Sequence, residues 1–322
     1  MNRKIFLWIS LVLLALAATR AQSEPYPSKP VRILVGASAG GGSDILARML
    51  GDKFAQSLGQ PFVIDDKPGA ANTLAAAEVA RSNPDGYTLL IATNTGQAIA
   101  PHLMKLSFDP LKDLQPLALV ATVPQVLVVG PGEKAHSVGE LVAAMKAKGG
   151  AYNYASAGIG STQHIAGEML NLAAGTHARH VPYRGSSSAQ VDLISGQVQF
   201  MVDTTSSAMP QIISKKLRPL AVTTPGRLAQ LPDVPTMAEA GFPSVNIVTW
   251  YGLYAPARTP RPVLDRLYAE LQRVLQLPDV RERLDQLGAQ PAAMTMEQFA
   301  RMNSTEFESY GRLIKAAGIK SE

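Results

Sequence analysis

Two short stretches rich in glycine and serine are the parts of this 322-residue sequence best suited to bind an anion. The first is Ala39-Gly40-Gly41-Gly42-Ser43-Asp44, and the second, residues 155–161, has the sequence ASAGIGS. Each follows an apolar run and precedes apolar residues at helical spacing, which predicts a turn from a strand into a helix. Such a turn presents free backbone N–H groups and the positive end of a helix dipole to a ligand.

The two stretches also resemble each other. Residues 37–43 (ASAGGGS) and 155–161 (ASAGIGS) differ only at the fifth position. One interpretation is compositional, because alanine, glycine and serine are common residues and favour strand–helix turns. The other interpretation is that two lobes present the same kind of helix start across a cleft. There they would bind a ligand that carries a carboxylate at one or both ends.

Nucleotide binding and serine chemistry are less well supported. A dinucleotide motif beginning at Gly40 and Gly42 has Ile45 where its third glycine should stand. The Gly-Lys-Ser/Thr of a phosphate-binding loop is missing as well. Around Ser156 the nucleophile-elbow pattern lacks its first glycine. A secreted serine hydrolase that acts on a small ester or amide stays as the alternative function.

The histidines do not form a motif with the spacing of metal ligands. They are His102, His136, His164, His177 and His180. Zinc sites usually combine several such residues at short, defined intervals. We therefore expect neither a metal nor another cofactor.

The N-terminus indicates export. Two basic residues, the apolar run 5–18 and the small residues 17–21 predict a secretory signal peptide over residues 1–21. Its removal takes away three of the 30 basic residues and no acidic one, which leaves 27 against 25 and a net charge of +2. This balance argues against nucleic acid as a partner and against direct membrane insertion of the mature chain. The sequence has no cysteine, which excludes disulfides, and we expect a periplasmic protein.

Strands and helices alternate along the rest of the sequence, which predicts an α/β fold with mainly parallel sheets. Strands are expected at 31–36, 62–65, 87–92, 120–129, 152–155, 179–182, 198–202, 217–223 and 245–254. Helices are expected at 43–58, 72–81, 97–103, 138–148, 161–173, 262–275, 278–287 and 296–317. The length suits about two domains.

Two long extended segments are the candidate hinge strands between these domains. They are 120–129, which we expect to be interrupted at Pro124, and 245–254. Lobe 1 is then discontinuous and comprises residues 22–124 and 249–322, whereas lobe 2 comprises residues 125–248.

Polar side chains follow two of the predicted strands. Thr93-Asn94 and Asp203-Thr204 stand at strand ends, where open α/β sheets bind their ligands. Turn and capping roles explain such residues equally well. For Asp44 we expect a capping role at the start of its helix, and the alternatives are that it orders the loop or accepts a ligand's ammonium group.

Further motifs connect the sequence to a known family. They are YPSKP (26–30), AGGGSD (39–44), KPGA (67–70), PDGYT (84–88), SAG (156–158) with His164, VPYRG (181–185), LPDVPT (231–236) and KAAGI (315–319). With these motifs the sequence resembles the tripartite tricarboxylate transporter substrate-binding proteins, the Bug family of periplasmic receptors. The resemblance covers essentially all of the mature chain.

The resemblance implies a two-lobed, type II periplasmic-binding-protein fold that closes on a small carboxylate, and a receptor that is not an enzyme. It also implies a tripartite tricarboxylate-type membrane transporter, or a sensor, as the partner. With the strand-end residues included, the candidate ligand-binding residues are Ala39, Gly40, Gly41, Gly42, Ser43, Asp44, Thr93, Asn94, Ser156, Ala157, Gly158, Ser161, His164, Asp203 and Thr204. The chain departs from the family at Gly36-Ala37-Ser38, where an aromatic residue and a proline are common, and at Thr204, where asparagine is frequent. Both departures touch the expected pocket, so a relative's ligand is not transferred.

Overall fold

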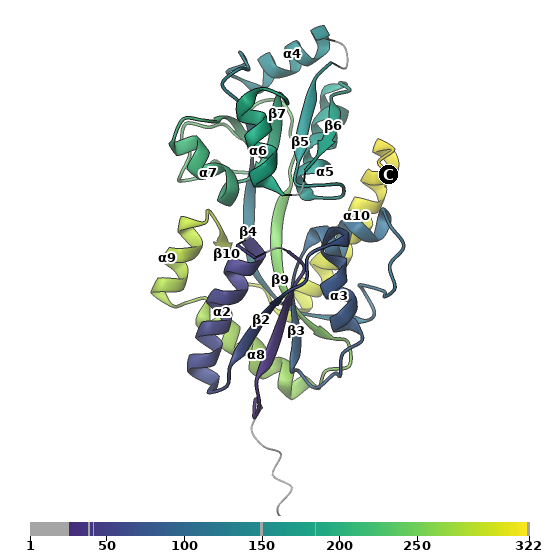
Figure 1. Cartoon of the computed structure of the whole chain (residues 1–322), viewed down its shortest axis with the longest axis vertical. Coiled ribbons are helices and arrows are strands. Elements are labelled where there is room, and N and C mark those ends of the chain that lie inside the picture. The colour runs from purple at the N-terminus through teal and green to yellow at the C-terminus, as the bar shows by residue number, and fades with distance from the viewer. Residues whose placement is uncertain (1–25, 38, 41, 149–150, 184, 321–322) are drawn as a thin grey trace, which may run out of the picture.

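The computed structural model describes residues 26–37, 39–40, 42–148, 151–183 and 185–320. It has two α/β lobes, and two long strands pass between them (Figure 1). The predicted signal segment, residues 1–21, and Gly41 lie outside the described residues. Among the helices of the described part, none is both long enough and apolar enough to span a bilayer.

The lower lobe in Figure 1 is built on three parallel strands, with β1 in the middle. They are β1 (Val31–Val35), β2 (Phe62–Asp66) and β3 (Thr88–Thr93). On its far side β3 pairs antiparallel with β9 (Val248–Pro256), which pairs in turn with the first part of β4 (Leu114–Val129). The sheet therefore continues without a break into the strands that lead to the other lobe. Because β9 and β4 pair antiparallel with their neighbours, the sheet is mixed, and the prediction of mainly parallel sheets is wrong.

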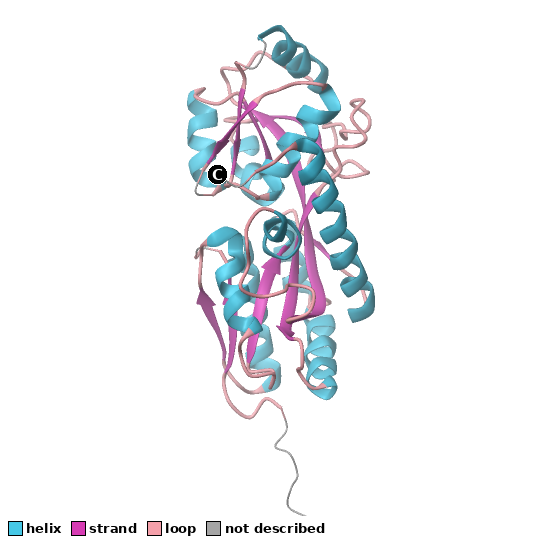
Figure 2. Ribbon diagram, turned by 90° about the vertical axis from the view of Figure 1, so that its right-hand side faces the viewer, coloured by secondary structure: helices cyan, strands magenta, loops and turns pink. Residues whose placement is uncertain are grey.

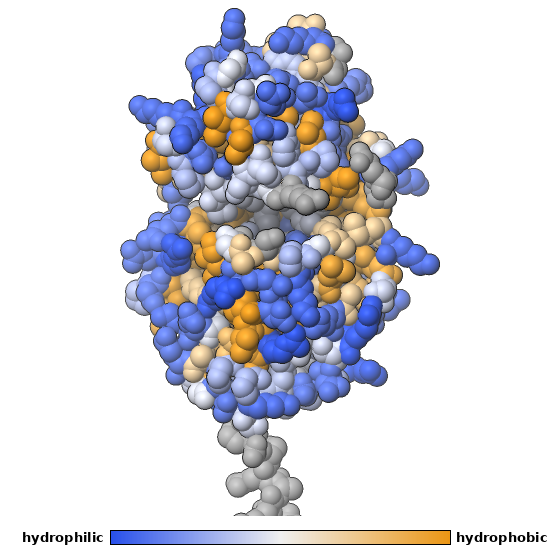
Figure 3. Space-filling model, viewed as in Figure 1, coloured by the Kyte–Doolittle hydropathy of each residue, from blue (hydrophilic) through white to orange (hydrophobic). Residues whose placement is uncertain are grey.

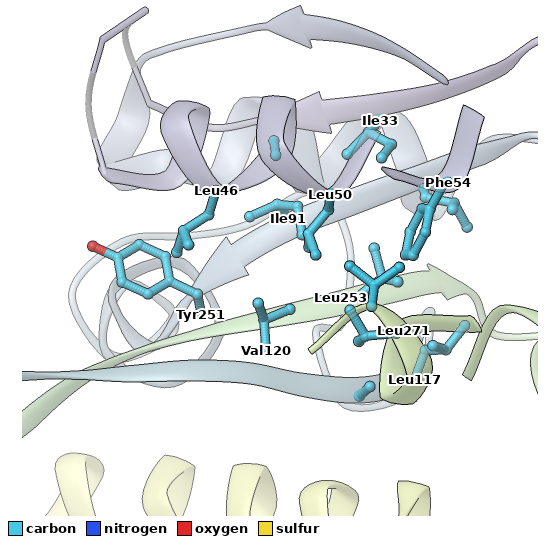
Figure 4. Packing of buried hydrophobic residues seen from close by; sticks show 14 of the residues in the cluster. Ile33, Leu46, Leu50, Phe54, Ile91, Leu117, Val120, Tyr251, Leu253 and Leu271 are labelled. Atoms are coloured by element: carbon cyan, nitrogen blue, oxygen red, sulfur yellow. The ribbon is translucent and has the colours of Figure 1, made fainter. Parts of the chain in front are cut away.

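Helices cover both faces of this sheet because their apolar stripes match its two apolar faces. On one face lie α2 (Gly42–Leu58) and α8 (Arg261–Val274), and on the other lie α3 (Thr73–Ala80) and α10 (Met296–Ala317). Leu46, Leu50 and Phe54 of α2 recur at helical spacing and are fully buried against the sheet (Figure 4). This packing fixes the direction in which the start of α2 points.

The upper lobe repeats the arrangement around the second part of β4. Its strands are β5 (Asn153–Ser156), β6 (Arg179–Pro182), β7 (Phe200–Thr204) and β8 (Arg218–Val222), in the order β4-β7-β5-β6, with β8 also on β4. One face carries α4 (Val138–Lys148) and α5 (Thr162–Ala174), and the other carries α6 (Ser186–Ser195) and α7 (Thr205–Ile213). Figure 2 shows the strands in the middle layer with helices on both sides.

Short elements complete the chain. The helices η1 (Ala70–Asn72), η2 (Thr95–Ile99) and η3 (Ala100–His102) follow strands of the lower lobe. The helix α9 (Pro278–Gln286) leads into β10 (Gln290–Pro291), which pairs antiparallel with β4 near Thr122. The last helix, α10, then runs upward along the molecule (Figure 1).

The strand β4 belongs to both lobes and is continuous, so the predicted interruption at Pro124 is wrong. Pro124 is the last residue of β4 that pairs with β9, and Gln125 is the first that pairs with β7. A residue without an N–H group is tolerated here because the ladder passes from one partner strand to another. The lobe boundaries proposed at 124/125 and 248/249 stay a prediction.

Two helices are absent from the sequence-based prediction. The helix α6 begins with three serines, which favour loops over helix interiors, and α7 contains Pro210. Apolar burial of residues such as Leu193 and Ala208 stabilises both helices in the fold. The predicted strand 245–254 begins only at Val248.

Candidate ligand-binding site

Four helices begin where strands end, at the level at which the lobes meet. The starts of α2 and η2 follow β1 and β3 of the lower lobe, and those of α5 and α7 follow β5 and β7 of the upper lobe. Figure 3 shows a hollowed band between the lobes on this face of the molecule, and we call it the interlobe cleft. Open α/β sheets bind ligands at such carboxyl ends of strands.

The starts of α2 and α5 converge on one face of β9. A Cβ atom on Gly42 would lie 2.6 Å from the hydroxyl oxygen of Tyr251, so the start of α2 rests directly on that tyrosine. The hydroxyl of Thr162, the first residue of α5, lies 2.7 Å from the hydroxyl of Thr249. Thr249 and Tyr251 are two residues apart in a strand, so their side chains share a face and stand about 7 Å apart along it.

Tyr251 lies on the face of β9 where the starts of α2 and α5 converge. Figure 4 shows its ring at the edge of the apolar cluster, with the hydroxyl pointing away from the other side chains. The side chain is 5% exposed, and the negative charge of Asp203 in the upper lobe acts on it. Burial raises the pKa of Tyr251 to about 12, and Asp203 adds to this effect. At neutral pH the residue is therefore a neutral hydroxyl that can donate a hydrogen bond.

The first glycine bend is ordered by its own aspartate. The N–H of Gly40 donates to Asp44 Oδ2 at 2.8 Å, and Arg48 Nε lies 2.7 Å from Asp44 Oδ1. Burial raises the pKa of Asp44, but the bonds from Gly40 and Arg48 outweigh it and hold the pKa below its usual value. Of the three roles considered for Asp44, the structure therefore supports ordering of the loop. Ala39 is exposed beside it, and Ser43 is buried.

The second bend is held from beneath by two histidines. The N–H of Gly160 donates to His164 Nδ1 at 3.1 Å, and His180 Nε2 lies 2.6 Å from the hydroxyl oxygen of Ser156. The two imidazole rings stack at 3.7 Å between centroids. Burial lowers the pKa of His164 to about 4 and that of His180 to about 3. Both rings are consequently neutral at pH 7, and His164 shapes the bend as a hydrogen-bond acceptor.

The remaining residues of this bend complete the start of α5. Ser161 is the N-cap, and its hydroxyl accepts from the N–H of His164 at 3.2 Å. The N–H of Gly158 donates to the hydroxyl of Ser156 at 3.0 Å, and Ala157 is half-buried between them. The first N–H groups of an α-helix, here those of Thr162 and Gln163, have no acceptor within the helix. They are therefore the donors that a bound anion can use.

Asp203 lies near the end of β7 and is fully buried between the starts of α6 and α7. Its carboxylate accepts from Ser186 Oγ at 2.7 Å, from Gln190 Nε2 at 2.7 Å and from the N–H of Thr204 at 2.8 Å. Burial raises the pKa of Asp203, and these hydrogen bonds oppose that rise. Asp203 thereby joins the first turn of α6 to Thr204, the N-cap of α7.

Thr93 and Asn94 stand at the end of β3, as expected, but both are buried. The amide of Asn94 donates to the carbonyl oxygen of Val248 at 2.8 Å and to the hydroxyl of Tyr310 at 3.3 Å. The hydroxyl of Thr93 accepts from Asn72 Nδ2 at 3.4 Å. Asn94 therefore fastens the end of β3 to the start of β9 and to α10.

The pair Ser156–His180 has the atom types of a nucleophile and its base, but its environment does not suit hydrolysis. Ser156 is fully buried, and its hydroxyl also lies 3.1 Å from the carbonyl oxygen of Gly158. The lowered pKa of His180 makes this ring a weak base at neutral pH. Among the described residues, no group of three or more His, Cys, Asp or Glu side chains is placed to hold a metal ion.

The polar residues at the centre of the site include several that the sequence analysis did not select. They are Thr162, Gln163, Ser186, Gln190, Thr249 and Tyr251. Thr162 and Gln163 directly follow the second bend, so their place in the first turn of the predicted helix could have identified them from the sequence. The importance of Thr249 and Tyr251 depends on which face of β9 is covered, and only the tertiary structure shows that.

Comparison with known proteins gives a consistent result. A family model described as the tripartite tricarboxylate transporter family receptor matches residues 46–319. A protein from the tcbD-tcbE intergenic region of Pseudomonas sp. (strain P51) is 37% identical over 97% of this chain and 94% of its own. Protein BugT of Bordetella pertussis (strain Tohama I) is 32% identical over 99% of both chains.

Solved structures agree with these matches. The structure of R. palustris Rpa4515 with adipate has a TM-score of 0.86 and 31% identity, over 92% of this chain and 99% of that one. The structure of MatC from Rhodopseudomonas palustris with bound malate has a TM-score of 0.83 and 32% identity, over 90% of this chain and 100% of that one.

Proposed function

The chain belongs to the tripartite tricarboxylate transporter receptors, the family that includes the Bug proteins, and from this premise we propose that it captures a small carboxylate in the interlobe cleft. The family's fold is the two-lobed periplasmic-binding-protein fold, which this chain shares. The relatives with adipate and with malate support a carboxylate as the ligand class.

The observation that carries the proposal is the convergence of two helix starts on one face of β9. Gly42 of α2 rests on Tyr251, and Thr162 of α5 contacts Thr249. A carboxylate between them would receive backbone N–H groups from both lobes and the positive ends of both helix dipoles. Closure of the lobes on one anion follows from this shared coordination.

The cellular role extends this proposal. The mature chain resides in the periplasm after removal of residues 1–21, and lobe 1 (22–124 and 249–322) closes against lobe 2 (125–248). The closed form delivers its ligand to a tripartite tricarboxylate-type membrane transporter, with a sensor as the alternative partner. The chain acts as a receptor and not as an enzyme.

The test is a thermal-shift and calorimetric titration with mono-, di- and tricarboxylates, adipate and malate included. We expect at least one carboxylate to raise the unfolding temperature, since a ligand at one hundred times its Kd stabilises the folded state by about 2.7 kcal/mol. The same samples are assayed with generic esters as a control. Turnover of an ester, or failure of every tested carboxylate to bind, would contradict the proposal.

A further inference from the structure

A row of polar side chains connects the strands between the lobes to the start of α5. On β4, Gln125 Nε2 lies 3.3 Å from the hydroxyl of Thr249 on β9. That hydroxyl lies 2.7 Å from the hydroxyl of Thr162, which in turn lies 3.2 Å from Gln163 Oε1. These contacts join β4, β9 and the first turn of α5.

The row continues to the buried carboxylate of the upper lobe. Gln163 Nε2 lies 3.3 Å from the hydroxyl of Ser186, and Ser186 Oγ lies 2.7 Å from Asp203 Oδ1. A carboxylate only accepts hydrogen bonds, so Ser186 must donate to Asp203. Because its proton is used there, the hydroxyl of Ser186 accepts from the amide nitrogen of Gln163.

The same logic fixes every link toward β4. With its nitrogen toward Ser186, Gln163 turns its oxygen to Thr162, which must donate to it. Thr162 then accepts from Thr249, and Thr249 accepts from the amide nitrogen of Gln125. The acceptor at one end therefore sets the direction of the whole chain. It leaves Gln125 Oε1 as a buried oxygen that has no hydrogen-bond partner among the described residues.

We propose that Gln125 and Thr249 are positioning residues of the ligand site. They begin a one-way hydrogen-bond chain, oriented by Asp203, that holds the first turn of α5 against the two strands between the lobes. This inference rests on the proposed function, because that function assigns the N–H groups of this first turn to the bound anion. Gln125 is 0% exposed and Thr249 is 5% exposed, so both act through Thr162 and not by touching the ligand.

The hydrogen-bond chain is sensitive to a single break because all its members except the half-buried Ser186 are buried. A buried donor or acceptor that loses its partner has no water to replace it, and linked hydrogen bonds strengthen one another. Thr249→Val removes the central hydroxyl at nearly constant volume. Gln125→Glu places an acceptor-only group where the chain needs a donor.

The first test measures the effect of Q125E on the unfolding equilibrium constant in three backgrounds without ligand. These are the wild-type, D203A and T249V proteins, examined by denaturant unfolding at pH 8. We expect Q125E to be at least about fivefold less damaging in D203A, where the chain has lost the acceptor that orients it and can reverse, and in T249V, where it is already broken. An equal effect in all three backgrounds overturns the proposal. So does relief in D203A alone, which indicates direct charge repulsion.

The second test asks whether the hydrogen-bond chain positions the first turn of α5 for ligand binding. Adipate is the first probe, followed by the tightest carboxylate of the titration. We expect T249V to raise the Kd at least about tenfold and T249S, which keeps the hydroxyl, to restore it. Thr259→Val is the matched control, since this buried hydroxyl donates to the carbonyl oxygen of Pro256 at 2.8 Å and lies outside the chain.

An unchanged Kd in T249V, or a T249S variant as weak as T249V, overturns the positioning role. The unfolding measurement needs no ligand. A negative result for carboxylate binding is therefore distinguishable from a negative result for the proposed hydrogen-bond chain.

Discussion

In the proposed ligand site, single residues hold the backbone of the two glycine bends in place. Asp44 binds the N–H of Gly40, Ser156 binds that of Gly158, and His164 binds that of Gly160. The side chains of both bends are thus occupied with shaping the loops. The free donors are the backbone N–H groups of the helix starts, which no side-chain substitution removes directly.

A charge added to the first bend should therefore weaken binding. Gly40 has φ 77°, and among the described residues nothing lies within 4 Å of a Cβ atom built there. Asparagine and aspartate tolerate this left-handed region better than other non-glycine residues, so both variants carry a similar backbone strain. We expect Gly40→Asp to raise the Kd for the carboxylate at least about tenfold, which corresponds to about 1.4 kcal/mol of repulsion. The Kd is measured by calorimetry.

The control is Gly40→Asn, which has the same shape without the charge and should stay within about threefold of the wild-type Kd. Equal losses in the two variants would show that the first bend does not face the anion.

Among the elements, α10 is fastened to β9 by buried polar groups. Trp250 Nε1 donates to Glu306 Oε2 at 2.6 Å, and Asn94 bridges Val248 and Tyr310. Burial raises the pKa of Glu306 to about 7, although the hydrogen bonds from Trp250 and Asn94 oppose this rise. The junction of α10 with β9 therefore contains a carboxyl group that titrates near neutral pH.

This junction predicts a pH dependence of stability with a defined sign. Between pH 4.5 and 7 folded Glu306 keeps a proton that the unfolded chain has lost, so its contribution to stability falls as the pH rises. We expect Glu306→Gln to remove this loss, because an amide does not titrate and its oxygen still accepts from Trp250.

The measurement is the difference in unfolding free energy between Glu306→Gln and wild type from pH 4.5 to 8. The variant should gain relative stability with rising pH, by at most about 1.4 kcal/mol per pH unit. A difference that is independent of pH would refute the assignment.

On the scale of the whole molecule, β4 and β9 pass side by side from one lobe to the other (Figure 1). In the proposed closing motion the lobes rotate about these two adjacent strands, and Tyr251 and Thr249 stay together on one face of β9. A ligand held by both helix starts favours the closed arrangement. Closure should therefore be visible in the overall dimensions of the protein.

Small-angle X-ray scattering tests this expectation. The radius of gyration should decrease when a carboxylate that binds in the titration is added at saturation, and Gly40→Asp should show no decrease at the same ligand concentration. A scattering curve unchanged by a ligand that calorimetry shows to be bound would contradict lobe closure.

Sequence alone determined most of the strand–helix alternation and the turn into α5 at the second glycine bend, and it predicted a site for a carboxylate. These features depend on local patterns, namely glycines between an apolar run and a helical repeat. The sequence-based prediction missed α6, with its run of serines, and α7, with Pro210. There, local propensity was overridden by apolar burial in the upper lobe.

Only the tertiary structure decided which polar side chains meet. Thr162 and Thr249 are 87 positions apart, and Gln125 and Thr249 are 124 apart, yet their side chains form one chain of hydrogen bonds. The alternation of a strand shows that Thr249 and Tyr251 share a face, but not what covers it. That choice depends on how α2 and α5 pack across the sheet, because contacts between distant segments are set by the core of the whole fold.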